Sequence, residues 1–111
     1  MLSRLNAYRI MWVFVTFDLP TNTKEQRKAY REFREFLLES GFIMIQFSVY
    51  ARPCASREMS AAFKKRVKSK VPDEGAVLLH EVTDKQFGMM EFYVSPGWRV
   101  KPEKPKQLKL F

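Results

Sequence analysis

The hydrophobic pattern of the chain starts with an unbroken apolar run over residues 10–17, which gives way to Asp18 and a turn at Leu19-Pro20. The apolar residues of this run do not alternate with polar ones, so both faces of the strand that it predicts should be covered. A carboxylate at the end of such a strand is the strongest candidate for chemistry in the chain. The run therefore raises two questions: what covers its second face, and what Asp18 does.

Helical periodicity predicts two helices. The first is expected to begin at Thr23, where Thr23-Lys24-Glu25-Gln26 matches a capping box, and to end near Gly41, a residue suited to the left-handed cap position. The second is expected to begin after Ser56 and to end near Lys70. Each pattern has one apolar stripe. The first stripe holds Ala29, Tyr30, Phe33, Phe36 and Leu37, and the second holds Met59, Ala62, Phe63 and Val67.

Three further stretches are extended in pattern. Residues 42–52 predict either one long strand or two short strands joined at Gln46-Phe47-Ser48. Met44 and Tyr50 share a face with Ser48, and we expect that face to lie opposite the helices. Residues 76–82 predict a third strand and residues 89–95 a fourth, with residues 83–86 as the connection.

This order of elements predicts an α+β fold: a ferredoxin-like sandwich with a mainly antiparallel sheet and two helices on one face. Residues 1–95 form the expected domain, and residues 96–111 a basic, proline-containing tail with a possible edge strand. Two helices cover one sheet face only, and an apolar second face would be exposed in a monomer. We therefore expect a homodimer packed through its sheets, with the tail strand able to extend the partner's sheet.

Composition fits a single small domain with a polyanionic partner. The chain has 111 residues and a net charge of +8, and nucleic acid is the commonest polyanion that such a surface binds. A merely solvated basic surface is the alternative, and a membrane is disfavoured because no stretch approaches the roughly 20 apolar residues of a spanning helix. The apolar run lacks a small-residue cleavage site, so we expect a cytoplasmic protein.

The candidate nucleic-acid contacts lie on the two predicted helices. Their spacing of three to four residues places each group on one side of its helix, where it could follow a duplex backbone without contacting bases. Solvated charge is the usual explanation of such faces, and an RNA-binding sheet with stacking aromatics is a competing one, although its signature is absent. The candidates are Arg27, Arg31 and Arg34 on the first helix, and Lys64, Lys65 and Lys68 on the second.

Asp18 is the candidate catalytic and metal-binding residue. A carboxylate at a strand end can bind a divalent cation and orient a phosphate, but an aspartate before Leu-Pro often only accepts hydrogen bonds from turn amides, and the residues alone favour that role. One carboxylate is too little for Mg²⁺ unless a dimer axis supplies a second. The single cysteine, Cys54, and the single histidine, His80, do not support a disulfide framework or a zinc site, and we discount them as a nucleophile-base pair.

Three stretches together resemble a known family: MWVFVTFDLP, GFIMIQFSVYAR and TDKQFGMMEFYVS, which fall between residues 8 and 95. They look like the small CRISPR-associated adaptation protein that partners the CRISPR integrase (the "Cas-two" family), in the variant found beside a single large effector nuclease. The resemblance implies a ferredoxin-like homodimer flanked by two integrase dimers. It also matches Asp18 to the family's metal-binding aspartate, with Mg²⁺ as the expected cofactor.

The resulting hypothesis is a CRISPR adaptation subunit that binds protospacer duplex DNA and bridges integrase dimers, with a candidate metal-dependent phosphodiesterase site at Asp18. The first alternative is an endoribonuclease or DNase that acts on its own, with single-stranded RNA as the expected substrate. The second is a ferredoxin-like regulatory dimer that binds a small ligand. Because the family's C-terminal segment commonly docks on the integrase, Leu108, Leu110 and Phe111 are the candidate partner contacts.

Overall fold

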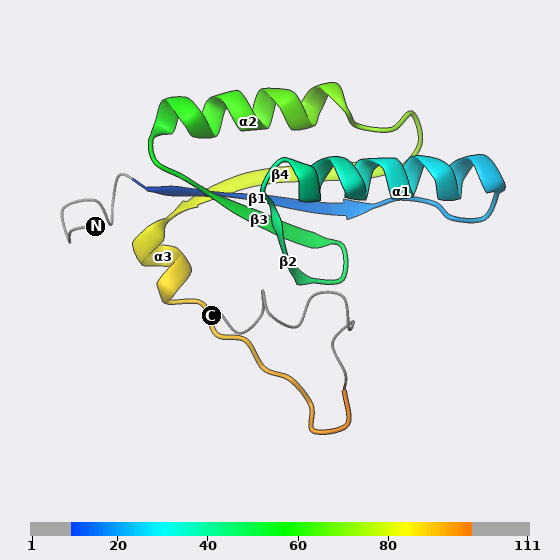
Figure 1. Ribbon diagram of the computed structural model, residues 1–111. Helices are drawn as coiled ribbons and strands as arrows, with labels where there is room; N and C mark the ends of the chain where they lie inside the picture. Colours follow the sequence, from blue (N-terminus) through cyan, green and yellow to red (C-terminus); the bar gives the residue numbers. More distant parts are fainter. Residues whose placement is uncertain (1–9, 99–111) are drawn as a thin grey trace.

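The computed structural model describes residues 10–98, and these form one antiparallel sheet with helices on both of its sides (Figure 1). The strands lie in the order β2-β3-β1-β4. This alternation and strand order are those of a ferredoxin-like sandwich, so the predicted fold class is confirmed. The elements are β1 (Met11–Asp18), α1 (Lys24–Glu39), β2 (Ile43–Gln46), β3 (Val49–Cys54), α2 (Arg57–Ser69), β4 (Ala76–Thr83) and α3 (Asp84–Gly88).

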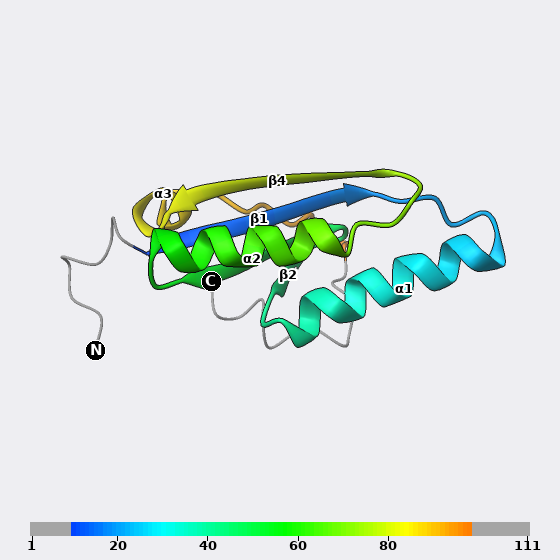
Figure 2. The same cartoon turned by 90° about the horizontal axis from the view of Figure 1, so that it is seen from above.

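The apolar run forms β1, which lies inside the sheet between β3 and β4. Its residue Val15 pairs with Tyr50 of β3 on one side and with Leu79 of β4 on the other. The alternate residues Val13 and Val15 are completely buried in a core beneath α1 and α2, which lie over the same face of the sheet (Figures 1 and 2). Within the described residues, no helix is long and apolar enough to cross a membrane.

The predicted helix ends are confirmed. The Thr23 hydroxyl accepts a hydrogen bond from the Gln26 amide at 3.1 Å, and the Gln26 side chain accepts one from the Thr23 amide at 3.0 Å, which completes the capping box. Gly41 adopts a φ of 90° after α1. A side chain there would also meet Arg52, whose Nε donates to the Ser40 carbonyl at 2.8 Å.

Residues 42–52 form two strands, which decides between the alternatives that the sequence left open. The chain reverses between β2 and β3, where Ser48 has a φ of 65°. The expected face of Met44 and Tyr50 was wrong: they are 3% and 1% exposed in the core beneath the helices. Alternation correctly places these two residues on one face, but a period of two does not say which face the helices cover.

The fourth strand predicted over residues 89–95 was also wrong, since these described residues form no strand. The chain instead forms α3 directly after β4. The Thr83 hydroxyl accepts from the Gln86 amide at 3.1 Å and the Gln86 side chain accepts from the Thr83 amide at 2.8 Å. Thr83-Asp84-Lys85-Gln86 is thus a second capping box with the same spacing as the one at Thr23, and this signal was available in the sequence.

Helix α3 covers part of the sheet surface opposite α1 and α2, which we call the far face (Figure 1). The Phe87 ring stacks on Trp12 with ring centroids 3.9 Å apart, and Trp12 Nε1 donates to Asp84 Oδ1 at 2.8 Å. Both contacts lie at the start of β1. Towards the other end of β1 the far face includes Thr16, which pairs with Leu78, and then Asp18.

A buried polar contact joins α2 to β4. Ser60 is fully buried and donates a hydrogen bond to the Glu81 carboxylate, and Lys64 Nζ lies 3.3 Å from the same carboxylate. The Ser60 hydrogen bond is the main cause that lowers the pKa of Glu81, and Lys64 adds to it. Since the folded pKa lies below the unfolded one, this stabilisation is present above the unfolded pKa of about 4.3 and is lost as the pH falls through the folded pKa.

We therefore expect Glu81→Gln to reduce the free energy of unfolding by about 1–2 kcal/mol at neutral pH, because a charge-assisted hydrogen bond and an ion pair are weakened. The effect should be smaller at an acid pH below the folded pKa, where the wild-type carboxylate is protonated too. Urea unfolding at both pH values measures this. Glu58→Gln, an exposed change on α2, is the control, and an equal loss at both pH values would contradict the assignment.

Candidate metal and nucleic-acid sites

Asp18 is the last residue of β1, and its side chain is exposed. It shares the far face with Thr16, because alternate residues of a strand point to the same side. Its backbone is held from β4, where Asp18 pairs with Ala76. The preceding Gly75 has a φ of +101°, and a Cβ there would lie 2.7 Å from the Asp18 carbonyl oxygen, so only glycine allows this close approach.

Among residues 10–98, no group of three side chains of the kind that hold a metal ion surrounds Asp18 or any other residue. Asp84 lies beside Trp12 at the opposite end of β1, about 20 Å away at roughly 3.4 Å per residue along the strand. A lone carboxylate fits Mg²⁺ as one of its six oxygen ligands, with waters, phosphate oxygens or a carboxylate from another chain as the rest. One copy of the chain therefore supplies part of a site.

The far face has exposed apolar side chains, as expected. They belong to other residues, because Met44 and Tyr50 are buried in the core. Leu78 is 61% exposed, and His80 is exposed and stacks on Phe14 with ring centroids 5.1 Å apart. The segment after α3 is also rich in exposed apolar side chains. These are Met89, Met90, Phe92, Tyr93, Val94 and Trp98.

The predicted nucleic-acid contacts all lie on α1 and α2, which run next to each other on one side of the sheet (Figure 2). Arg31, Lys65 and Lys68 are exposed, and Arg34 is partly exposed. Lys64 and Arg27 are among those with partners in the fold. Lys64 pairs with Glu81, and Arg27 Nη1 donates to the carbonyl oxygens of Thr21 and Asn22 at 3.2 Å each.

Two further cations, Arg66 on α2 and Lys70 at its C-cap, lie outside the predicted set. Arg66 and Lys70 are exposed, and the Arg66 guanidinium lies 4.8 Å from the centroid of the Phe63 ring. The sequence signal that could have identified both residues was the run of basic residues in the second half of the second predicted helix. The positive surface of α2 is therefore broader than the predicted three lysines.

The remaining candidates do not come together. Cys54 is buried among the core residues, where burial raises the pKa of its thiol, whereas His80 lies on the far face. The two are thus on opposite sides of the sheet, and the discounted nucleophile-base pair is not formed. Leu108, Leu110 and Phe111 lie outside the described residues.

Comparison with known proteins identifies the family. A family model described as "CRISPR associated protein Cas2" matches residues 11–90. A "CRISPR-associated endoribonuclease Cas2" of Flavobacterium psychrophilum is 48% identical over 98% of this chain and 95% of its own. Another, of Parvibaculum lavamentivorans, is 48% identical over 91% of this chain and its own full length.

A solved structure agrees with this on the level of the fold. A chain described as "Crystal structure of cas2" superposes with a TM-score of 0.58 at 20% identity, covering 84% of this chain and 92% of that one. At this identity the likeness supports the shared fold alone. The family model and the two relatives show more than the fold: this chain belongs to the Cas2 family of CRISPR-associated proteins.

Proposed function

We propose that this protein is a CRISPR adaptation subunit that binds duplex DNA and bridges integrase dimers during spacer integration. Family membership supports a role in CRISPR systems. The observation that carries the proposal is the distribution of positive charge: exposed cations lie along two neighbouring helices on one side of the sheet. Lysine and arginine side chains placed in this way contact phosphates and carry no sequence preference, which suits a protein that must accept any protospacer.

A homodimer is part of this proposal. The far face exposes Leu78, and the segment after α3 adds several large apolar side chains, so a second copy is a suitable cover. Two copies packed through their far faces would direct α1 and α2 of both copies outward. The cations of each copy would then remain open to a duplex, with integrases on either side of the dimer.

Asp18 is the proposed metal ligand of the dimer. It lies on the far face, so a second copy could bring a second carboxylate towards it and complete an oxygen-rich site. Mg²⁺ bound there would polarise a phosphodiester and favour the deprotonation of a bound water. The two relatives are named endoribonucleases, and this observation favours RNA cleavage at Asp18 as the second candidate function.

The DNA-binding proposal is tested by titrating the protein with duplex DNA at about 50 mM and about 200 mM salt. We expect Lys65→Ala/Lys68→Ala to weaken binding roughly tenfold or more at the lower salt and to reduce the slope of log K against log salt by nearly 2, about 0.9 for each lost phosphate contact. These two lysines are chosen because Lys64 already pairs with Glu81.

Lys85→Ala is the matched control, since Lys85 is exposed on α3 at the other side of the sheet. It should change neither the affinity nor the slope. Wild-type protein that binds no duplex at either salt concentration would contradict the proposal and would favour the regulatory dimer without nucleic acid.

A further inference from the structure

Negative charge is concentrated in one place on this basic protein. The chain has twelve acidic residues and a net charge of +8, yet six of the twelve line two adjoining hollows that share Ala29 and Pro72. We call these hollows together the acidic groove. Its six carboxylates are those of Glu25, Glu32, Glu35, Glu39, Asp73 and Glu74.

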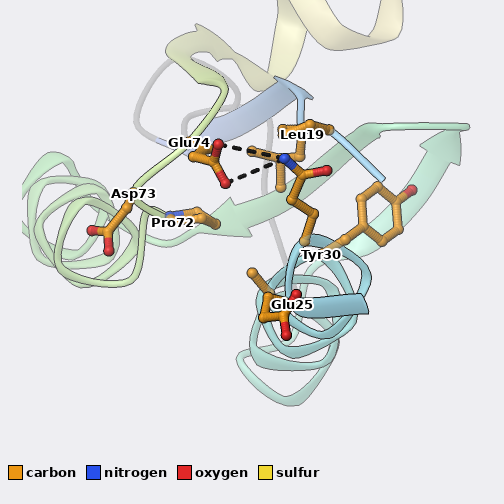
Figure 3. A pocket seen from close by; sticks show the side chains of 9 residues that line it. Leu19, Glu25, Tyr30, Pro72, Asp73 and Glu74 are labelled. Carbon is orange, nitrogen blue, oxygen red and sulfur yellow. Dashed lines mark hydrogen bonds between the residues drawn. The ribbon is translucent and has the colours of Figure 1, made fainter. Parts of the chain in front are cut away.

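The first hollow of the acidic groove lies between the start of α1 and the loop before β4 (Figure 3). It has a volume of about 310 Å³. Leu19 and Tyr30 give it an apolar wall, and the Glu74 carboxylate accepts hydrogen bonds from Gln26 Nε2 at 3.3 and 3.4 Å. The site thus combines apolar surface with carboxylates, one of which is already oriented.

The second hollow continues along α1 towards the end of α2 and has a volume of about 440 Å³. Phe33 and Phe36 contribute apolar surface, and Glu32 lies 4.0 Å from Lys28. Lys70 is the basic residue among the lining side chains that the structure describes, and its Nζ lies 5.9 Å from the centroid of the Phe36 ring. The carboxylates of this hollow therefore outnumber its cations.

Such a groove repels nucleic acid and suits a cationic segment that also carries apolar side chains. Residues 99–111 of this chain have that character: five basic residues against one glutamate, and an ending of Leu108, Leu110 and Phe111. Fully extended, these 13 residues span up to about 43 Å at roughly 3.3 Å each. That length allows a segment that starts after Trp98 to pass from one side of the sheet to the other.

We propose that the C-terminal segment, residues 99–111, binds in the acidic groove of its own chain. Lysines of the segment pair with the six carboxylates of the groove, and its apolar residues contact the apolar surface of Leu19, Tyr30, Phe33 and Phe36. Exposed ion pairs contribute only about 0.2–1 kcal/mol each, so both kinds of contact are needed and the binding weakens with salt. The groove adjoins the helices whose cations are proposed to bind the duplex, but this proposal is tested without DNA, so its failure and that of duplex binding are distinguishable.

The test uses the full chain with a nitroxide spin label on Gln107→Cys. The native Cys54 is 1% exposed and stays unlabelled in the folded protein. We expect paramagnetic loss of amide signal at groove residues such as Ala29, Phe36 and Asp73, while Lys65 and Lys85 keep theirs. The loss should be independent of protein concentration and should diminish at high salt.

Glu35→Gln/Glu39→Gln should remove this pattern, because both carboxylates are exposed in the groove. Glu58→Gln/Glu91→Gln makes the same charge change at exposed positions outside the groove and should preserve it. Unchanged amide shifts away from the mutated positions show that each variant is folded. The proposal is overturned by signal loss centred on another surface, by loss that disappears on dilution, or by loss that the groove variant leaves intact.

Discussion

Asp18→Ala is expected to abolish the proposed metal-dependent phosphodiesterase activity while leaving duplex binding unchanged. The loss should be at least about a hundredfold, because a bound metal ion stabilises the charge of the transition state by several kcal/mol. No cluster of metal-ligating side chains among residues 10–98 could take over its role. Cleavage of single-stranded RNA, measured with and without added Mg²⁺, tests this.

Two controls separate chemistry from folding. Asp18→Asn keeps the shape of the side chain and removes its charge, so it should lose the activity too. Asp84→Asn changes an aspartate at the other end of β1, where its partner is Trp12, and should keep the activity. Full RNA cleavage by Asp18→Ala would place the nuclease site elsewhere.

The same Asp18→Ala variant distinguishes the two proposed functions in a cell. An architectural subunit needs its cations and its partner surfaces, so spacer acquisition should survive the loss of the carboxylate. Acquisition that fails while duplex binding is intact would instead indicate that cleavage at Asp18 is required. We expect survival, because the basic surface of α1 and α2 does not involve Asp18.

Local sequence signals predicted the framework that holds Asp18. The unbroken apolar run predicted a strand covered on both faces; β1 lies between two other strands, with two helices over one face and α3 over part of the other. The caps at Thr23 and Ser56 predicted where α1 and α2 begin, because a side-chain acceptor near free helix amides is recognisable within four residues. Each of these features depends on neighbours in sequence.

What the sequence did not predict depends on contacts between distant residues. Tyr50 was assigned to the wrong face, since only its place in the core, together with Leu37 and Val67, fixes the side on which it lies. The stretch after β4 has a strand-like composition. It nevertheless begins with α3, whose Asp84 and Phe87 side chains contact Trp12, and Trp12 and Asp84 are 72 residues apart in the sequence. These contacts hold α3 against the far face. The isolation of Asp18 from Asp84 likewise follows from strand register, not from residue type.

Leu78→Glu is expected to prevent the proposed dimerisation and, with it, to abolish any cleavage at Asp18. Leu78 is 61% exposed on the far face and pairs with Thr16, one alternate position before Asp18. A carboxylate there would be buried without a partner in a dimer packed through the far faces, at a cost of several kcal/mol. Size-exclusion chromatography with light scattering should give 13.2 kDa for the variant and twice that mass for the wild type.

Val71→Glu is the matched control, because Val71 is an exposed apolar residue after α2, away from the far face. It should leave both mass and cleavage unchanged. The two readouts belong together, because one chain supplies a single carboxylate and the proposed site takes its second carboxylate from another copy. A Leu78→Glu protein that is monomeric and still cleaves RNA would show that Asp18 acts within one chain, and one that remains dimeric would show that the copies meet through another surface.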